Sequence, residues 1–217
     1  MQNQDRPLTA RERLWFACTL ALLGMLLVAC SSCAMAPYPV DPPTMSDPAV
    51  VKLVKIGEDG ADAGYCTAWK LDGERIMTAG HCCDDGASYV TRGPHAILTT
   101  VGTVLYDDDA HDVCVLKGKI NGAPIKLADM DPRLGEPVWT AGYPKTEFLI
   151  SSGYWSGRDE DDQCKASVAV WGGASGSPIF NNKGEAVGVL VAFRPPMSNL
   201  AYCTPLEYMK IANTLGH

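Results

Sequence analysis

A glycine-rich turn in the last quarter of the chain holds a serine that could act as a nucleophile. Ser175 lies in the segment 171–178 (WGGASGSP), between apolar runs at 167–170 and 179–180. Glycines on both sides of a serine allow backbone angles that other residues avoid, so backbone N–H groups can converge beside its hydroxyl. A hydroxyl next to two convergent donors supplies the nucleophile and the oxyanion site that acyl transfer needs. The alternative is an ordinary hairpin, which glycine and serine also form.

A base for this serine, and a partner for that base, lie upstream. His81 stands at the end of a strand-like apolar run, and Asp112 stands at the start of another. Imidazole has the proton affinity to accept the hydroxyl proton of Ser175 and to pass it to a leaving amine. Asp112 is the candidate for holding the correct tautomer of His81 and for stabilising the imidazolium. The backbone N–H groups of Gly173 and Ser175 are the candidate oxyanion donors.

The order His81, Asp112, Ser175 is the chain order of chymotrypsin-type enzymes, and it differs from the orders in subtilisins and in α/β-hydrolases. The sequence resembles the trypsin-like (chymotrypsin-fold) serine proteases, and in particular their bacterial branch. The matching motifs span most of residues 50–204 and are TAGHC around His81, HDVCVL around Asp112, AGYP at 141–144 and GGASGSP at 172–178. The resemblance implies a serine endopeptidase that cleaves protein or peptide substrates through an acyl-enzyme.

The elements that must position these residues are short β-strands. β-prone runs broken by Gly, Asn and Asp lie at 50–56, 66–69, 97–106, 138–143, 148–155, 186–193 and 200–203. Many short strands at this spacing favour an all-β barrel or sandwich. The resemblance specifies two antiparallel six-stranded β-barrels with a C-terminal helix. It places the first barrel at about 49–120, the second at about 124–204 and the crossing between them at 117–124.

One helix is predicted at residues 205–215. Thr204 can cap it, Pro205 suits its first position, and Glu207 completes a T-x-x-E capping box. An apolar stripe at helical spacing follows, and Gly216 ends it. The members of the stripe are Leu206, Met209, Ala212 and Leu215.

Two departures from the family pattern concern activation and specificity. Ala174 stands where many trypsin-like zymogens have an aspartate that pairs with a freed N-terminus, so the resemblance implies an enzyme that is competent as folded. Ala169 lies near the base of the family's primary specificity pocket and offers no charge for a lysine or arginine side chain. Val191, Ala192 and Phe193 are the candidate pocket wall, with Phe193 in a place usually held by glycine. These residues indicate a shallow pocket for a small apolar side chain.

The front of the chain has the composition of an export signal. Residues 1–13 are polar with three arginines, and residues 14–29 are apolar and uncharged. A run of this length falls short of the ~20 residues that span a bilayer, so a secretion signal is favoured over a permanent anchor. The sequence Leu27-Val28-Ala29-Cys30 resembles the cleavage box of bacterial lipoprotein precursors, which implies cleavage before Cys30 and attachment of lipid to it. The alternative is a buried cysteine in an uncleaved helix.

The domain organisation follows from that signal. We expect a lipoprotein signal peptide at 1–29, a tether at 30–48 and the protease domain at 49–217. Residues 31–48 contain five prolines among small residues, which is typical of an extended, semi-stiff linker. The expected location is the bacterial cell envelope, with the domain held to the membrane through Cys30.

Nine cysteines provide a further indication of export. Cys18 leaves with the signal, Cys30 takes lipid and Cys33 lies in the tether. The six cysteines of the domain are an even number, as expected in an oxidising compartment. The resemblance pairs Cys66 with Cys82, beside the catalytic histidine. Cys83–Cys114 and Cys164–Cys203 are the remaining expected pairs, although spacing alone does not fix connectivity.

Other binding functions are disfavoured. The net charge of −7 argues against nucleic acid or an anionic membrane surface as a partner. Neither the histidines and cysteines nor the acidic runs at 107–109 and 159–162 have the spacing of zinc or calcium sites, so no metal is expected. No cofactor is expected either. The alternatives to an endopeptidase are a catalytically silent protease fold that binds a partner at the envelope, and an esterase with the same triad.

Overall fold

A computed structural model describes residues 49–84, 86–93, 96, 100–194 and 197–216, together with Thr9, Ala10 and Trp15. The chain separates into two compact units, Met1–Pro39 and Val40–His217, and the second holds all the strands described below. The proposed signal peptide and tether lie outside the described residues apart from those three positions, and Cys30 is outside as well. Within the described part of the chain, no helix has the length and apolar character needed to cross a membrane.

The first half of the domain forms one antiparallel sheet, with strand order β5-β4-β1-β2-β3-β7-β6. Its strands are β1 (Val50–Ile56), β2 (Asp62–Asp72), β3 (Arg75–Thr78), β4 (Ser88–Arg92), β5 (Thr100–Val101), β6 (Thr103–Asp108) and β7 (Val113–Lys117). The two edge strands, β5 and β6, are separated in sequence by Gly102 alone. The sheet therefore has seven strands rather than the expected six because one strand is interrupted at this glycine.

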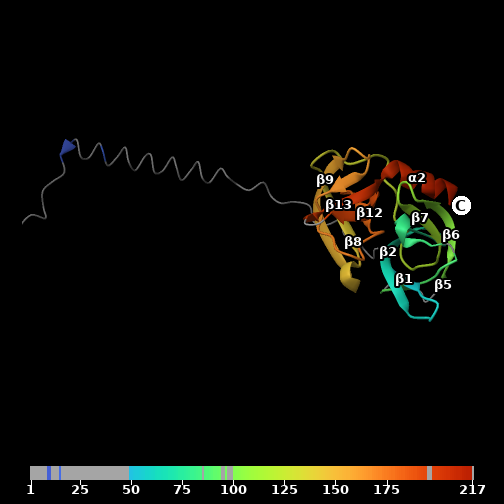
Figure 1. The fold of residues 1–217 in the computed structure, drawn as a ribbon. Helices are drawn as coiled ribbons and strands as arrows, with labels where there is room; N and C mark the ends of the chain where they lie inside the picture. Colours follow the sequence, from blue (N-terminus) through green and yellow to red (C-terminus); the bar gives the residue numbers. More distant parts are fainter. Residues whose placement is uncertain are drawn as a thin grey trace, which may run out of the picture. The chain divides into compact units, whose positions relative to one another are not determined.

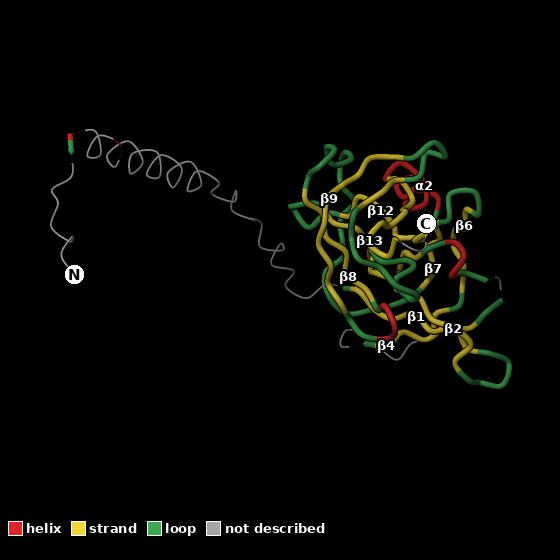
Figure 2. Tube along the Cα trace, turned by 60° about the vertical axis from the view of Figure 1, so that its left-hand side comes forward, coloured by secondary structure: helices red, strands yellow, loops and turns green. Residues whose placement is uncertain are grey.

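The second half of the domain forms a closed barrel, in the order β10-β13-β12-β11-β8-β9. Figure 1 labels four of these strands, β8, β9, β12 and β13. Its strands are β8 (Pro137–Gly142), β9 (Leu149–Arg158), β10 (Cys164–Ala166), β11 (Pro178–Phe180), β12 (Ala186–Arg194) and β13 (Met197–Pro205). Figure 2 shows that strands and loops make up nearly all of this domain. The expected all-β, chymotrypsin-like fold class is confirmed.

Three apolar clusters form the core of the domain, and one of them joins the two halves. One cluster lies within the first sheet and includes Leu53 and Leu116, and another lies within the barrel and includes Val138 and Ile179. The third contains residues from both halves, among them Trp69, Met77, Phe180 and Val189. Because Trp69 and Met77 are fully buried in this shared cluster, the two halves pack against each other through a common apolar core.

The C-terminal helix α2 (Leu206–Leu215) packs on strands of both halves, namely β6 and β7 of the sheet and β12 and β13 of the barrel. Leu206, Met209 and Ala212 are buried as the stripe predicted, whereas Leu215 is 61% exposed. The predicted capping box is wrong. The N-cap residue is Pro205, and no side chain caps the helix. Thr204 belongs to β13 instead, and its buried hydroxyl bonds the main chain near Asp112.

Disulfides join Cys66 to Cys82, Cys83 to Cys114 and Cys164 to Cys203, the three pairs set out above. The first two link β2 and β7 to the short 3-10 helix η1 (Gly80–Cys82) and the residue after it. The third joins β10 to β13 where Cys164 and Cys203 are register partners. Two bridges therefore fix the segment that carries His81, which follows β3. One bridge ties it to β2 and the other to β7, the two strands that flank β3 in the sheet.

Candidate active site

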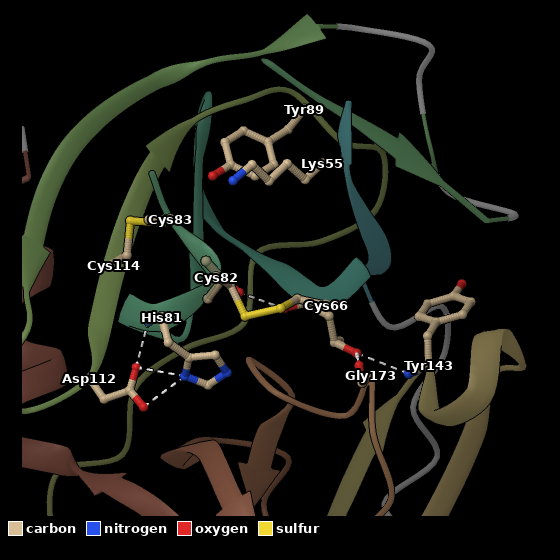
Figure 3. Close-up of a disulfide and its surroundings, with 12 residues drawn as sticks. Lys55, Cys66, His81, Cys82, Cys83, Tyr89, Asp112, Cys114, Tyr143 and Gly173 are labelled. Carbon is tan, nitrogen blue, oxygen red and sulfur yellow. Dashed lines mark hydrogen bonds and ion pairs between the residues drawn. A yellow bond between two sulfur atoms is a disulfide. The ribbon is translucent and has the colours of Figure 1, made fainter. Parts of the chain in front are cut away.

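The side chains of His81 and Asp112 are in direct contact. The Nδ1 atom of His81 lies 2.8 Å and 3.0 Å from the two carboxylate oxygens of Asp112, and its backbone N–H donates to the same carboxylate at 2.8 Å. Figure 3 shows the second ring nitrogen directed away from the carboxylate, on the side on which Gly173 lies. The carboxylate therefore fixes the orientation of the ring and leaves the other nitrogen free for chemistry.

The close approach of η1 to Asp112 depends on Gly80. A Cβ atom at Gly80 would lie 3.1 Å from the main chain and from the carboxylate of Asp112. A larger residue would push the two segments apart and lengthen the contacts of His81. The disulfide between Cys66 and Cys82 anchors the same turn of chain to β2 from the other side. The TAGHC motif is thus explained by packing as well as by the histidine.

Asp112 adopts a left-handed backbone conformation, with φ at 54°. This region is uncommon for residues other than glycine, although aspartate is among those that tolerate it. Thr204 holds the conformation, since its hydroxyl lies 2.7 Å from the carbonyl oxygen of His111 and 3.0 Å from that of Asp112. A strand of the barrel therefore sets the main chain from which the Asp112 side chain reaches His81.

Ser175 lies in two consecutive tight turns. The N–H of Ala174 donates to the carbonyl of Trp171, and the N–H of Ser177 donates to that of Ala174. Each turn has a glycine in its third position with positive φ, 92° at Gly173 and 86° at Gly176. Such angles are strained for residues with a side chain, so the two glycines are required by the turns.

The first sheet holds this turn in place through Thr67. The N–H of Thr67 donates to the carbonyl of Ser175 at 2.8 Å, and its hydroxyl donates to the carbonyl of Gly173 at 3.0 Å. The same hydroxyl accepts the N–H of Tyr143 at 3.0 Å. Gly176 also lies against the sheet, because a Cβ there would overlap the Thr67 carbonyl and would lie 3.2 Å from the N atom of Ala79. The turn that carries Ser175 is thus packed against the end of β3, two residues before His81.

Ser175 and His81 are brought to the same region without being bonded. Within the described residues, the hydroxyl of Ser175 makes no hydrogen bond with His81. Such contacts are often long in the absence of substrate and shorten in the complex.

Two backbone donors of the turn are unused. The N–H groups of Gly173 and Ser175 bond to no acceptor in the part of the chain that the structure describes. An unpaired N–H beside a nucleophilic hydroxyl can bind the negative oxygen of a tetrahedral intermediate. The two donors predicted from the sequence are therefore available for this role.

The pKa of His81 is raised above its usual value of 6.5, because its ring nitrogen bonds the Asp112 carboxylate; burial partly opposes this shift. The His81 side chain remains 47% exposed. Imidazole in this setting is a stronger base than free histidine and is still accessible to a substrate.

The residues predicted for specificity are only partly brought together. Ala169 lines a cavity behind the turn that carries Ser175. Val191 is buried and Ala192 is exposed, both on β12. The side chain of Phe193 lies outside the described residues. No charged group lines the cavity at Ala169.

Among the described residues, one group of possible metal ligands is clustered: the ligand atoms of Cys66, His81 and Cys82 lie within 4.8 Å of one another. The two sulfurs are bonded to each other, so they cannot act as thiolate ligands. Sequence reasoning missed Thr67 and Thr204, the two hydroxyls that hold the candidate residues in place. The position of Thr67, next to Cys66 of the expected bridge, is the only sequence signal that could have indicated either residue.

Comparison with known proteins agrees with this geometry. A family model described as "Trypsin-like peptidase domain" matches residues 64–189, a stretch that contains His81, Asp112 and Ser175. The HhoA protein of Synechocystis, a serine protease by name, is 27% identical over 173 residues, which cover 71% of this chain. The chain spans 43% of the length of that relative.

Two solved structures have the same fold. A serine endoprotease from Yersinia pestis has a TM-score of 0.69 at 19% identity, covering 78% of this chain and 63% of its own. The active form of a protease from M. tuberculosis has a TM-score of 0.65 at 19% identity, covering 78% of this chain and 81% of its own. At these identities the likeness concerns the fold.

Proposed function

Because the chain belongs to the trypsin-like peptidase domain family, we propose that it is a serine endopeptidase in which Ser175, His81 and Asp112 form the catalytic triad. The observation that carries this proposal is that the Asp112 carboxylate forms two kinds of hydrogen bond with His81, one with its ring nitrogen and one with its backbone N–H. A carboxylate that only stabilised the fold would not need to orient an exposed imidazole beside a serine turn.

The first half of the reaction makes an acyl-enzyme. The Oγ atom of Ser175 attacks the carbonyl carbon of a peptide, while its proton moves to the free ring nitrogen of His81. The C=O bond electrons shift to the oxygen, which accepts hydrogen bonds from the N–H groups of Gly173 and Ser175. His81 then gives the proton to the leaving nitrogen as the C–N bond breaks. Asp112 stabilises the imidazolium throughout.

The second half returns the enzyme to its starting state. Water attacks the acyl carbon and gives its proton to His81, and the new oxyanion is bound by the same two N–H groups. The bond from carbon to Oγ breaks, and His81 returns the proton to Ser175. No cofactor is required for either half.

The substrates of this reaction are proteins or peptides, with a preference for a small apolar side chain before the cleaved bond. Two features support this preference: Ala169 is small, and the cavity at that position has no charged lining residue. A lysine or arginine side chain would lose hydration in such a pocket without gaining a partner.

The domain acts at the bacterial envelope, attached through a lipid on Cys30. The support is the uncharged run at 14–29, which ends in Leu-Val-Ala and is followed by Cys30, together with the disulfides, which fit an oxidising compartment. Metabolic labelling with a palmitate analogue tests the anchor. Incorporation in the wild-type chain and its loss in Cys30→Ala are expected, and labelling that survives in Cys30→Ala contradicts the anchor.

Cleavage of a peptide library by the full-length protein tests the activity. We expect cuts after small apolar residues, which Ser175→Ala and His81→Ala abolish. A correctly folded wild type that cleaves neither peptides nor esters would indicate a silent, partner-binding protease fold. Cleavage of esters alone would indicate an esterase.

A further inference from the structure

The disulfide between Cys66 and Cys82 lines a cavity that it shares with His81. The cavity has a volume of about 280 Å³, and all three residues belong to its wall. Cys66 is partly exposed, whereas the other five cysteines of the domain are buried. Because the rate of thiol–disulfide exchange depends on access to the sulfur, a reductant reaches this bridge more readily than the other two.

The two sulfurs lie beside the imidazole of His81. Their Sγ atoms and a ring nitrogen of His81 are within 4.8 Å of one another. A tetrahedral zinc ion with usual bond lengths holds two sulfurs about 3.8 Å apart, and a sulfur and a nitrogen about 3.6 Å apart. The Cα atoms of Cys66 and Cys82 are 6.3 Å apart, so rotation of the two side chains can supply these separations once the bridge is open.

Asp112 already orients His81 as a metal ligand needs to be oriented. The Nδ1 atom of His81 bonds both carboxylate oxygens of Asp112, at 2.8 Å and 3.0 Å. Histidine ligands usually donate their other ring N–H to a carboxylate, which fixes the tautomer and makes the ligand nitrogen more basic. Figure 3 shows the second ring nitrogen turned away from Asp112. One nitrogen is thus held by the carboxylate, and the other is free to bind a metal.

The other charged groups of the cavity bond each other. The ammonium of Lys55 bonds the carboxylate of Asp84, and the N–H of Asp84 donates to the hydroxyl of Tyr89 at 2.7 Å. The carboxylate of Asp84 is therefore engaged, and the charges of Lys55 and Asp84 cancel. A metal in this cavity has three protein ligands, and solvent takes the fourth position, as in zinc sites with two cysteines and one histidine.

We propose that reduction of this bridge creates a zinc site made of Cys66, Cys82 and His81, and that zinc bound there keeps the protein inactive. Thiolate and imidazole are ligands that zinc prefers and that magnesium and calcium avoid. The site itself does not depend on the proposed function. The loss of activity does rest on it, because the metal occupies the ring nitrogen that would accept the proton of Ser175.

The reductant is a dithiol. Its thiolate attacks the Sγ atom of Cys66, and the bond to Cys82 breaks, so that Cys82 leaves as a thiolate and takes up a proton. The second thiolate of the reductant then displaces Cys66 in the same way, which gives the protein two thiols and the reductant one disulfide. Zinc replaces the proton of each thiol when it binds, so binding releases protons and becomes tighter as the pH rises.

Selective reduction is tested with the full-length protein, in which the three cysteines before residue 49 are replaced by serine so that they supply no thiols. A limited amount of dithiothreitol is added, and free thiols are alkylated and located by mass spectrometry of peptides. We expect Cys66 and Cys82 to be alkylated first. Earlier alkylation of either of the other two pairs overturns the access that the cavity provides.

Cobalt(II) tests the ligands, because its absorption reports thiolate bonds and tetrahedral geometry. We expect the reduced protein to bind a single cobalt ion, which zinc displaces, and the oxidised protein to bind none. The matched control is C66S/C82S, which should show no thiolate absorption after the same limited reduction. Asp112→Asn keeps all three ligands and should bind roughly 10- to 100-fold more weakly, since the carboxylate behind His81 is lost.

Each of these results can overturn the site. Thiolate absorption that survives in C66S/C82S shows that other sulfurs bind the metal. An affinity of Asp112→Asn equal to that of its parent removes His81 from the ligands. A reduced protein that binds no cobalt removes the site altogether.

The loss of activity is tested by the rate at which a fluorophosphonate labels Ser175. Zinc should block labelling of the reduced protein, a chelator should restore it, and the same zinc concentration should leave the oxidised protein unaffected. Loss of labelling before zinc is added, or an equal loss in the oxidised protein, overturns inhibition through this site. A wild type that is labelled in neither state overturns the proposed function instead, and the cobalt measurements still decide the site.

Discussion

The hydroxyl of Thr204 donates a hydrogen bond to the main-chain carbonyl of Asp112 at 3.0 Å, across 92 residues of sequence. The same hydroxyl also bonds the carbonyl of His111, so a barrel strand holds the Asp112 main chain in its left-handed conformation. The carboxylate of Asp112 in turn orients His81. The geometry of the candidate site therefore depends on Thr204, a residue that contacts none of the reacting atoms.

Replacement of Thr204 tests this chain of contacts. We expect Thr204→Val to slow labelling of Ser175 by a fluorophosphonate several-fold, since the Asp112 main chain loses its hold. We also expect a loss of about 1–3 kcal/mol in the free energy of unfolding, because the partly buried carbonyls of His111 and Asp112 lose the single O–H donor that they share. Thr204→Ser keeps the hydroxyl and should behave as the wild type. An unchanged labelling rate in Thr204→Val would show that Asp112 is held by other contacts.

The pH dependence of labelling reports the His81–Asp112 contact. The pKa of His81 is raised above 6.5 by this contact, so the neutral base should form with a midpoint above pH 6.5 and the rate should rise through it. Asp112→Asn removes the carboxylate, which lowers the pKa of His81 and moves the midpoint to lower pH. The plateau rate should also fall, by roughly 10,000-fold if the variant behaves as the corresponding change does in chymotrypsin-type enzymes. A midpoint that does not move in Asp112→Asn contradicts the assigned contact.

Thr67 joins the first sheet to the turn that carries Ser175, and its side chain is fully buried. In Thr67→Val the carbonyl of Gly173 and the N–H of Tyr143 both lose their partner. We expect a loss of about 1–3 kcal/mol in unfolding free energy, measured by urea denaturation, together with slower labelling of Ser175. Thr67→Ser should restore both properties. A stability loss without any change in labelling would restrict Thr67 to a structural role.

Arg158 connects β9 to the helix α2 and to two loops. Its guanidinium bonds the carboxylates of Asp131, Asp162 and Glu207, and the bond from Arg158 lowers the pKa of Glu207. A carboxylate with a lowered pKa stabilises the fold above its unfolded pKa, and this contribution is lost as pH falls through the folded value. Arg158→Gln should therefore lower stability at pH 7 by about 1 kcal/mol or less, given the exposure of Glu207, and the difference should shrink as the pH falls through the lowered pKa of Glu207, which lies below 4.5. A difference that persists at low pH contradicts the electrostatic explanation.

The sequence was most informative where function and backbone geometry demand the same residues. Gly80 and Gly176 are needed for close approach, and they stand in the motifs that also contain His81 and Ser175. The strand β1 was predicted with the bounds that it has, because a β-prone run rich in valine, leucine and isoleucine ends at Gly57. The resemblance predicted the Cys66–Cys82 pair, whereas the other two pairs were expectations that the even count of cysteines does not fix, and the structure contains all three.

The roles of Thr67 and Thr204 could not be predicted, because each depends on contacts with residues about a hundred positions away. Thr204 was misassigned for a related reason. Its local pattern favours a helix cap, but burial in β13 beside two main-chain carbonyls gives its hydroxyl better partners. The strands β10 and β11 have three residues each, too few to show a periodic pattern.

The most direct test of the account is labelling of the full-length protein with a fluorophosphonate, followed by mass spectrometry of the modified peptide. We predict one adduct, on Ser175, formed in the wild type and absent from Ser175→Ala, with both proteins equally folded by circular dichroism. A folded wild type that forms no adduct, or one that forms its adduct on another residue, would contradict the proposal that Ser175 is the nucleophile of a serine peptidase.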